Sequence, residues 1–151
     1  MSQPDLERKA INYLAAHNVV TLATQGANGL WAAAVFYVND RFDLYFLSAG
    51  HTRHAQNIAA NAAVAATVQE DYKDWPDIKG IQLSGDVERL SGARQEKAIA
   101  LYLEKYPFVA NSAELRPALP RVNWYRLRPH CLYMIDNRLG LGHRDLIIDL
   151  G

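Results

Sequence analysis

The sequence has a single cysteine, no long apolar run and no excess of either charge. With Cys131 alone, no intramolecular disulfide can form, which excludes a disulfide-stabilised secreted domain. No apolar segment approaches the roughly 20 residues of a membrane-spanning helix, and residues 1–9 lack the apolar core of a signal peptide. The 16 basic and 16 acidic residues balance, so the basic excess typical of a nucleic-acid-binding protein is missing. We therefore expect a soluble cytoplasmic protein with no nucleic-acid or membrane partner.

What the sequence does contain is the composition of an ordinary globular protein. Half of its 151 residues are apolar and 21% are charged, which is enough to build a hydrophobic core without disulfides or metals. We expect one domain over residues 1–151, with an N-terminal helix at 5–17, a barrel at about 18–136 and a C-terminal tail at 137–151.

Short β-type segments joined by turn residues dominate the chain between the N-terminal helix and the tail. Six strands are predicted, at residues 19–24, 30–38, 42–48, 63–69, 78–90 and 124–136, together with helices at about 52–61 and 91–105. Because most neighbouring strands are joined by tight turns, the sequence predicts a mainly β fold, a six-stranded antiparallel barrel with peripheral helices.

The segment 48–55, where a strand ends and a helix begins near Thr52, carries the clearest chemical signal. A helix N-terminus presents unpaired N–H groups and a partial positive charge, so it favours anions. Arg53 and His54 lie in the first turn, where the helix dipole disfavours cations. A phosphate bound at the helix start would offset this unfavourable placement of cations, with Thr52 and Arg53 as its hydrogen-bond donors. The alternative is that Thr52 is an ordinary N-cap and that Arg53 and His54 are solvated.

The histidines and the cysteine indicate neither a metal site nor a catalytic set. His51 and His54 have a spacing that suits a metal, but no third ligand lies nearby in the sequence, so we predict no metal. No arrangement of serine, histidine and aspartate is recognisable, and Cys131 lies in a predicted strand without an activating neighbour. No catalytic residue is therefore assigned.

Two strands have features that suit a flat ligand. Ala32, Ala33 and Ala34 lie inside a predicted strand, where alanine has a low propensity, and small side chains let a flat ligand lie against the backbone. The alternative is that they leave room for bulky neighbours across the barrel. Gln82 and Ser84 lie on the polar face of the fifth strand, where they contact a ligand, a partner subunit or only solvent.

Four motifs, taken in order, resemble those of a known superfamily. Residues 52–55, Thr-Arg-His-Ala, are similar to its Ser-Arg-Lys-Ala phosphate turn, and residues 61–65 are similar to its Asn-Pro-x-Val/Ala strand entry. Residues 85–91, Gly-Asp-Val-Glu-Arg-Leu-Ser, and residues 124–129, Trp-Tyr-Arg-Leu-Arg-Pro, are similar to two later segments. On this pattern the chain resembles the pyridoxamine 5'-phosphate oxidase-like, FMN-binding split-barrel superfamily, and within it the bacterial group named after YhbP.

The resemblance implies a homodimer with FMN sites at the subunit interface and a flavin-dependent oxidoreductase that acts on a small substrate. The FMN phosphate would meet Thr52, Arg53 and His54. The flavin ring would lie along the second strand and the end of the third, and the partner subunit would contribute from the fifth and last strands. The residues implied for these contacts are Ala32, Ala33, Ala34, Val35, Leu47, Ser48, Gln82 and Trp124.

The sequence departs from the superfamily at positions that contact the cofactor and the substrate. His54 replaces the lysine of the phosphate turn, and ungapped alignment puts Ala32 at an arginine that helps to hold FMN. Gly80 takes the place of a glutamine that contacts the flavin ring in the oxidases. Tyr37 takes the place of the lysine that binds pyridoxamine phosphate. We therefore expect weak FMN binding and no oxidation of pyridoxamine phosphate.

The missing substrate residues leave a second hypothesis open. The chain could be a non-catalytic module on the same fold that binds flavin or haem. Haem would need an axial ligand, for which the candidates are His51, His54, His130 and His143.

Overall fold

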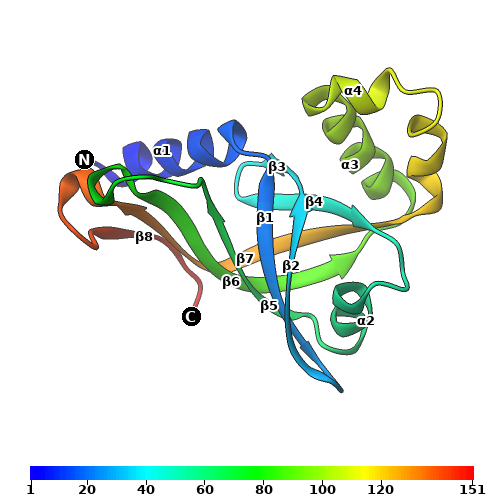
Figure 1. Ribbon diagram of the computed structural model, residues 1–151, viewed down its shortest axis with the longest axis horizontal. Coiled ribbons are helices and arrows are strands. Elements are labelled where there is room, and N and C mark those ends of the chain that lie inside the picture. Colours follow the sequence, from blue (N-terminus) through cyan, green and yellow to red (C-terminus); the bar gives the residue numbers. More distant parts are fainter.

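The computed structural model describes residues 1–151 and contains one antiparallel sheet curled into a half-barrel (Figure 1). The strand order is β2-β1-β5-β6-β7-β4-β3, and β8 pairs with β7. The strands are β1 (Val19–Gly26), β2 (Gly29–Phe36), β3 (Val38–Asp40), β4 (Asp43–Ser48), β5 (Ala63–Gln69), β6 (Lys79–Arg89), β7 (Asn123–Asp136) and β8 (Arg144–Asp149). The helices are α1 (Gln3–Ala16), α2 (Arg53–Ala60), α3 (Gly92–Lys105) and α4 (Pro107–Ala110), and the short 3-10 turns are η1 (Trp75–Asp77), η2 (Arg116–Arg121) and η3 (Asn137–Leu139). None of these helices is both long and apolar enough to span a bilayer.

The predicted mainly β, antiparallel split barrel with peripheral helices is confirmed, but it has eight strands, so the predicted count of six is wrong. The strand predicted at 30–38 breaks at Tyr37, which is buried and donates a hydrogen bond from its hydroxyl to Leu14 O (2.6 Å). The residues after this break form β3, which pairs with β4 around a tight turn at Arg41, where φ is 52°. The C-terminal tail contains the other additional strand, β8, in which Ile148 pairs with β7.

The inner face of the sheet holds the main hydrophobic core. Side chains alternate along β1, β5 and β6, so that Leu22, Val64 and Leu83 are buried while their neighbours point outward. Helix α1 adds Ala10 and Leu14 to this core, both fully buried. Because a slip of one residue would turn these apolar side chains to solvent, the core also fixes which residues face outward.

A second, smaller core lies where α3 and α4 pack against the sheet, at the end of the molecule away from the chain termini (Figure 1). Trp124 is its largest fully buried side chain, and it meets Tyr102 edge-on with ring centroids 5.3 Å apart. Val109 of α4 and Leu119 of η2 complete the cover. This region of the sheet is therefore closed to solvent.

Strand β2 forms one end of the strand order and pairs with β1 only. It comes close to β4 without being hydrogen bonded to it, so the barrel is split between β2 and the β3–β4 hairpin. No residue of β2 is fully buried. The chain leaves β4 and turns into α2 beside this opening (Figure 1).

Candidate functional site

The turn between β4 and α2 has the predicted form of a helix start. Thr52 has an extended backbone and acts as the N-cap, with its Oγ1 accepting a hydrogen bond from Ala55 N (3.3 Å). Thr52 Oγ1 also donates to Ala49 O (3.0 Å). The single hydrogen of the Thr52 hydroxyl is therefore used within the turn, as in the N-cap alternative, and is not free for a ligand in this arrangement.

Ser48 and His54 form a second set of hydrogen bonds in the turn. Ser48 Oγ lies 2.8 Å from His54 Nε2 and 2.9 Å from Thr52 Oγ1. Burial lowers the pKa of His54 because surroundings of low dielectric disfavour the charged imidazolium. His54 is therefore neutral at pH 7 and contributes hydrogen bonding rather than charge.

Arg53 is the charged group of the turn, and its guanidinium is held from two sides. Nη2 donates to Asn28 O in the β1–β2 turn (2.8 Å), and the guanidinium lies 4.2 Å from the centroid of the Trp31 ring. Nε is buried without a hydrogen-bond partner. A buried donor without an acceptor costs free energy, and an oxyanion bonded to this N–H would remove that cost.

The first backbone N–H groups of α2 are also without partners. Ala55 N bonds to Thr52 Oγ1 and Gln56 N bonds to Thr52 O, whereas neither Arg53 N nor His54 N has a protein acceptor. These groups form the positive end of the helix dipole. Together with Arg53 Nε they suit a phosphate, although the Thr52 hydroxyl and the His54 ring add no further charge.

Strand β2 adds small side chains and free backbone groups beside this turn. Ala32 and Ala34 are exposed on the outer face, and Ala33 and Val35 are half-buried toward the core. The edge of β2 that faces away from β1 keeps its N–H and C=O groups unpaired. Small side chains and free backbone groups are what a flat ring with polar edges needs.

The outer face of the sheet carries mostly small side chains across four strands. Two rows run in register across β2, β1, β5 and β6: Ala32, Ala23, Ala65 and Ser84, and Ala34, Thr21, Thr67 and Gln82. A surface pocket of about 290 Å³ lies on this face between β1 and β5. Gln82 is exposed and therefore shares the outer face with the alanines of β2.

Leu47 and Trp124 are neighbours in the β4–β7 pairing, and both belong to the second core. Leu47 is half-buried beside the turn. Trp124 is 0% exposed, and its Nε1 donates to Leu119 O (2.8 Å). The structure therefore uses Trp124 as a core residue and does not bring its indole to the surface that Thr52, Arg53 and β2 share.

Asn28 and Trp31 belong to the site although the sequence did not single them out. Both contact Arg53, and Trp31 is 44% exposed. The available signal is a tryptophan next to three alanines, at the third residue of the strand that follows a hairpin turn. Its meaning depends on the place of α2, which is distant in the sequence.

The histidines of the chain are dispersed, and no group of three or more histidine, cysteine, aspartate or glutamate side chains is arranged to hold a metal ion. His130 pairs with Asp86 (3.2 Å), and His143 pairs with Asp145 (3.1 Å). His51 is exposed at the turn, and only its backbone carbonyl takes part in a hydrogen bond. His51 is therefore the most available imidazole near α2.

The half-barrel, with a helix start at its opening, defines a split β-barrel protein. The chain belongs to the pyridoxamine 5'-phosphate oxidase family, because the family model of that description matches residues 6–136. It is 34% identical over 134 residues to the UPF0306 protein YhbP of Salmonella paratyphi A, which covers 87% of this chain and 86% of that protein. The predicted resemblance to this superfamily and to the YhbP group is confirmed.

Two solved structures share the fold. HutZ, the heme storage protein from Vibrio cholerae, aligns with a TM-score of 0.68 and 20% identity over 82% of this chain and 89% of that chain. A heme binding protein from Mycobacterium smegmatis aligns with a TM-score of 0.73 and 21% identity over 97% of this chain and 57% of that chain. At these identities the likeness shows the fold alone.

Proposed function

We propose that this protein is a homodimeric flavoprotein that binds the phosphate of FMN at the start of α2 and acts as an oxidoreductase on a small substrate other than pyridoxamine phosphate. The observation that carries the proposal is the buried, unpartnered Nε of Arg53 beside the free N–H groups of Arg53 and His54. FMN, when bound, supplies the redox chemistry, and the protein supplies binding and orientation.

The residues of the turn have distinct roles in this proposal. Arg53 gives charge-assisted hydrogen bonds to the phosphate, and Trp31 and Asn28 keep its guanidinium in position. His54 is neutral because burial lowers its pKa, so it gives no second charge. One cation instead of two is the physical reason to expect weak FMN binding.

The exposed surface of β2 supports the homodimer. Leu30 and Phe36 lie on the outer face and are 78% and 43% exposed, and the outer rows of small side chains continue this surface across the sheet. Large exposed apolar patches mark interaction sites because water contact with apolar atoms is unfavourable. A second copy packed on the outer face would cover β2 and any ring that lies along it.

The environment of Tyr37 supports a substrate other than pyridoxamine phosphate. Tyr37 stands where the resemblance expects the substrate lysine, and it is fully buried with its hydroxyl donated to Leu14 O. Burial raises the pKa of Tyr37, so the phenol stays neutral. This position therefore offers no charge to a substrate phosphate.

The test compares FMN with riboflavin, which has the same ring but no phosphate. We expect the protein, purified without added flavin, to quench FMN fluorescence at micromolar concentrations and to bind riboflavin more weakly. Arg53→Gln should lose about tenfold or more in FMN affinity, since a hydrogen bond to a charged group is worth about 1.5–3 kcal/mol, and should lose nothing for riboflavin.

The matched control is Arg121→Gln, which removes an exposed arginine at the end of η2. It should leave both affinities unchanged. Absence of FMN binding by the wild type, or equal FMN affinity of wild type and Arg53→Gln, would contradict the proposed phosphate site.

A second candidate, a haem-binding module, is favoured by the exposed imidazole of His51 at the same turn. Two proteins with this fold are described as a heme storage protein and a heme binding protein. A Soret band that appears on haem addition and is lost in His51→Ala but kept in His143→Ala would favour this candidate. Steady NAD(P)H oxidation in the presence of FMN would favour the flavoenzyme.

A further inference from the structure

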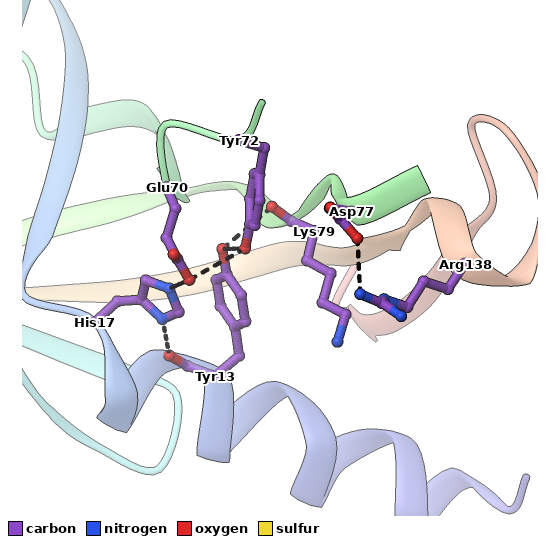
Figure 2. Close-up of a pocket in the computed structure, with 7 residues that line it drawn as sticks. All are labelled: Tyr13, His17, Glu70, Tyr72, Asp77, Lys79 and Arg138. Atoms are coloured by element: carbon purple, nitrogen blue, oxygen red, sulfur yellow. Dashed lines mark hydrogen bonds and ion pairs between the residues drawn. The ribbon is translucent and has the colours of Figure 1, made fainter. Parts of the chain in front are cut away.

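A polar pocket of about 460 Å³ lies at the end of the sheet away from α2 (Figure 2). It is formed by the end of α1, the β5–β6 connection, the start of β6 and η3. Its lining residues are Tyr13, His17, Glu70, Tyr72, Asp77, Lys79 and Arg138. None of them belongs to the turn proposed for the FMN phosphate.

One wall of the pocket is a fixed network of hydrogen bonds (Figure 2). The Tyr13 hydroxyl donates to Lys79 O (3.1 Å) and lies 3.1 Å from the Tyr72 hydroxyl. The Tyr13 ring stacks on His17 with centroids 3.9 Å apart. Burial raises the pKa of Tyr13, so its hydroxyl keeps its proton. Tyr13 is therefore held by several contacts and is uncharged.

His17 continues this wall with two polar contacts. Its Nδ1 lies 2.7 Å from Tyr13 O, and its Nε2 lies 2.8 Å from Glu70 Oε2. These two contacts hold the His17 ring between the end of α1 and Glu70.

Lys79 differs from the other basic side chains of the pocket in its partners. Arg138 pairs with Asp77 (2.7 Å) and His17 pairs with Glu70, whereas Lys79 forms no ion pair. In the view of Figure 2 the Lys79 amine lies between the tyrosines and the Arg138–Asp77 pair. Lys79 is therefore the cationic side chain of this pocket that is left without a carboxylate partner.

We propose that this pocket binds a small organic oxyanion, a carboxylate or a phosphate monoester, whose charged end pairs with Lys79. The free N–H groups of Arg138 give further charge-assisted hydrogen bonds, and the Tyr72 hydroxyl and Glu70 can bond a polar group at the other end of the ligand. A concave site with one uncompensated cation attracts monoanions and repels cations. This site is independent of the FMN phosphate turn.

The test uses inorganic phosphate and acetate as probes at constant ionic strength in a chloride buffer. Amide signals of Tyr72, Lys79 and Arg138 are followed by two-dimensional NMR during each titration. We expect saturable shifts of these signals with at least one probe. Saturation by acetate alone identifies a carboxylate ligand, and saturation by phosphate alone identifies a phosphate monoester.

Lys79→Gln is the informative variant and Lys73→Gln is its matched control. Lys73 lies in the same connection, pairs with Asp71 and is outside the pocket. Lys79→Gln should weaken binding by about tenfold or more, as expected for loss of a charge-assisted bond, and Lys73→Gln should not. Non-saturating shifts with both probes, or equal affinity of wild type and Lys79→Gln, would overturn the proposal. Arg53→Gln should bind the probes as the wild type does, which separates this site from the proposed FMN site.

Discussion

At the scale of single residues, His54 is the position that most directly sets the charge of the proposed phosphate site. Its ring bonds to Ser48 and is neutral because burial lowers its pKa. His54→Lys should therefore raise FMN affinity about tenfold by adding a second cation. Fluorescence titration checks this, with riboflavin as the ligand that should gain nothing. Gln56→Lys, an exposed position on the same helix, is the control, and an equal gain in both variants would contradict the assignment.

The same residue predicts a pH dependence of stability. The folded-state pKa of His54 is lowered, so the unfolded chain, with a pKa of about 6.5, takes up a proton at higher pH than the folded protein does. Stability therefore falls as the pH drops from about 6.5 through the lower folded pKa. Denaturant unfolding of wild type and His54→Gln, at a series of pH values above and below about 6.5, measures this dependence. The advantage of wild type over His54→Gln should shrink toward acid, and a constant difference would contradict it.

At the scale of elements, a buried polar pair holds α2 on β1. Asn57 Nδ2 donates to Thr24 Oγ1 (3.0 Å), and both side chains are buried. Asn57→Ala leaves the Thr24 hydroxyl unsatisfied and should cost about 1–3 kcal/mol of unfolding free energy. Because α2 carries Arg53, FMN affinity should fall as well.

A double-mutant cycle with Thr24→Val tests this pair by chemical denaturation. The two changes should be non-additive by about 0.5 kcal/mol or more, as is usual for residues in contact. Gln56→Ala, an exposed change on the same helix, should alter stability by less than about 0.5 kcal/mol. Additive effects of Asn57→Ala and Thr24→Val would show that the pair does not anchor α2.

The elements also show where sequence reasoning succeeds and where it stops. The turn into α2 was predictable because Thr52 caps its own helix and the charges of Arg53 and His54 are local. The contact of Arg53 with Trp31 was not, because it joins residues far apart in the sequence. The same holds for β8, which exists only through its pairing with β7, and for the burial of Trp124, which depends on α4 and η2. Local signals predict elements, whereas pairing and burial depend on tertiary contacts.

At the scale of the whole molecule, the two faces of the sheet have opposite characters. The inner face is filled by the core, and the outer face of β2, β1, β5 and β6 is a broad surface of small side chains without a large protruding residue at its centre. Interfaces between identical subunits are self-complementary, and a flat surface of small residues satisfies this geometry. The proposed dimer would also close the open side of β2.

Ala65 lies at the centre of this outer face, exposed between Ala23 and Ser84 in the register of the strands. Ala65→Glu should weaken the dimer about a hundredfold or more, because a two-fold interface buries the introduced carboxylate twice, and an unpaired buried charge costs several kcal/mol. Sedimentation velocity should show a dimer for wild type and a monomer for Ala65→Glu at micromolar concentration. Ala100→Glu, the same change at an exposed position of α3, should stay dimeric.

The same variants connect assembly to the cofactor. If the flavin ring lies between β2 and a partner subunit, Ala65→Glu should lose FMN affinity together with the dimer, although Arg53 and the start of α2 are unchanged. A monomeric wild type would contradict the dimer. A monomeric Ala65→Glu that binds FMN as tightly as wild type would place the whole cofactor site within one chain, since the phosphate turn alone would then account for the affinity.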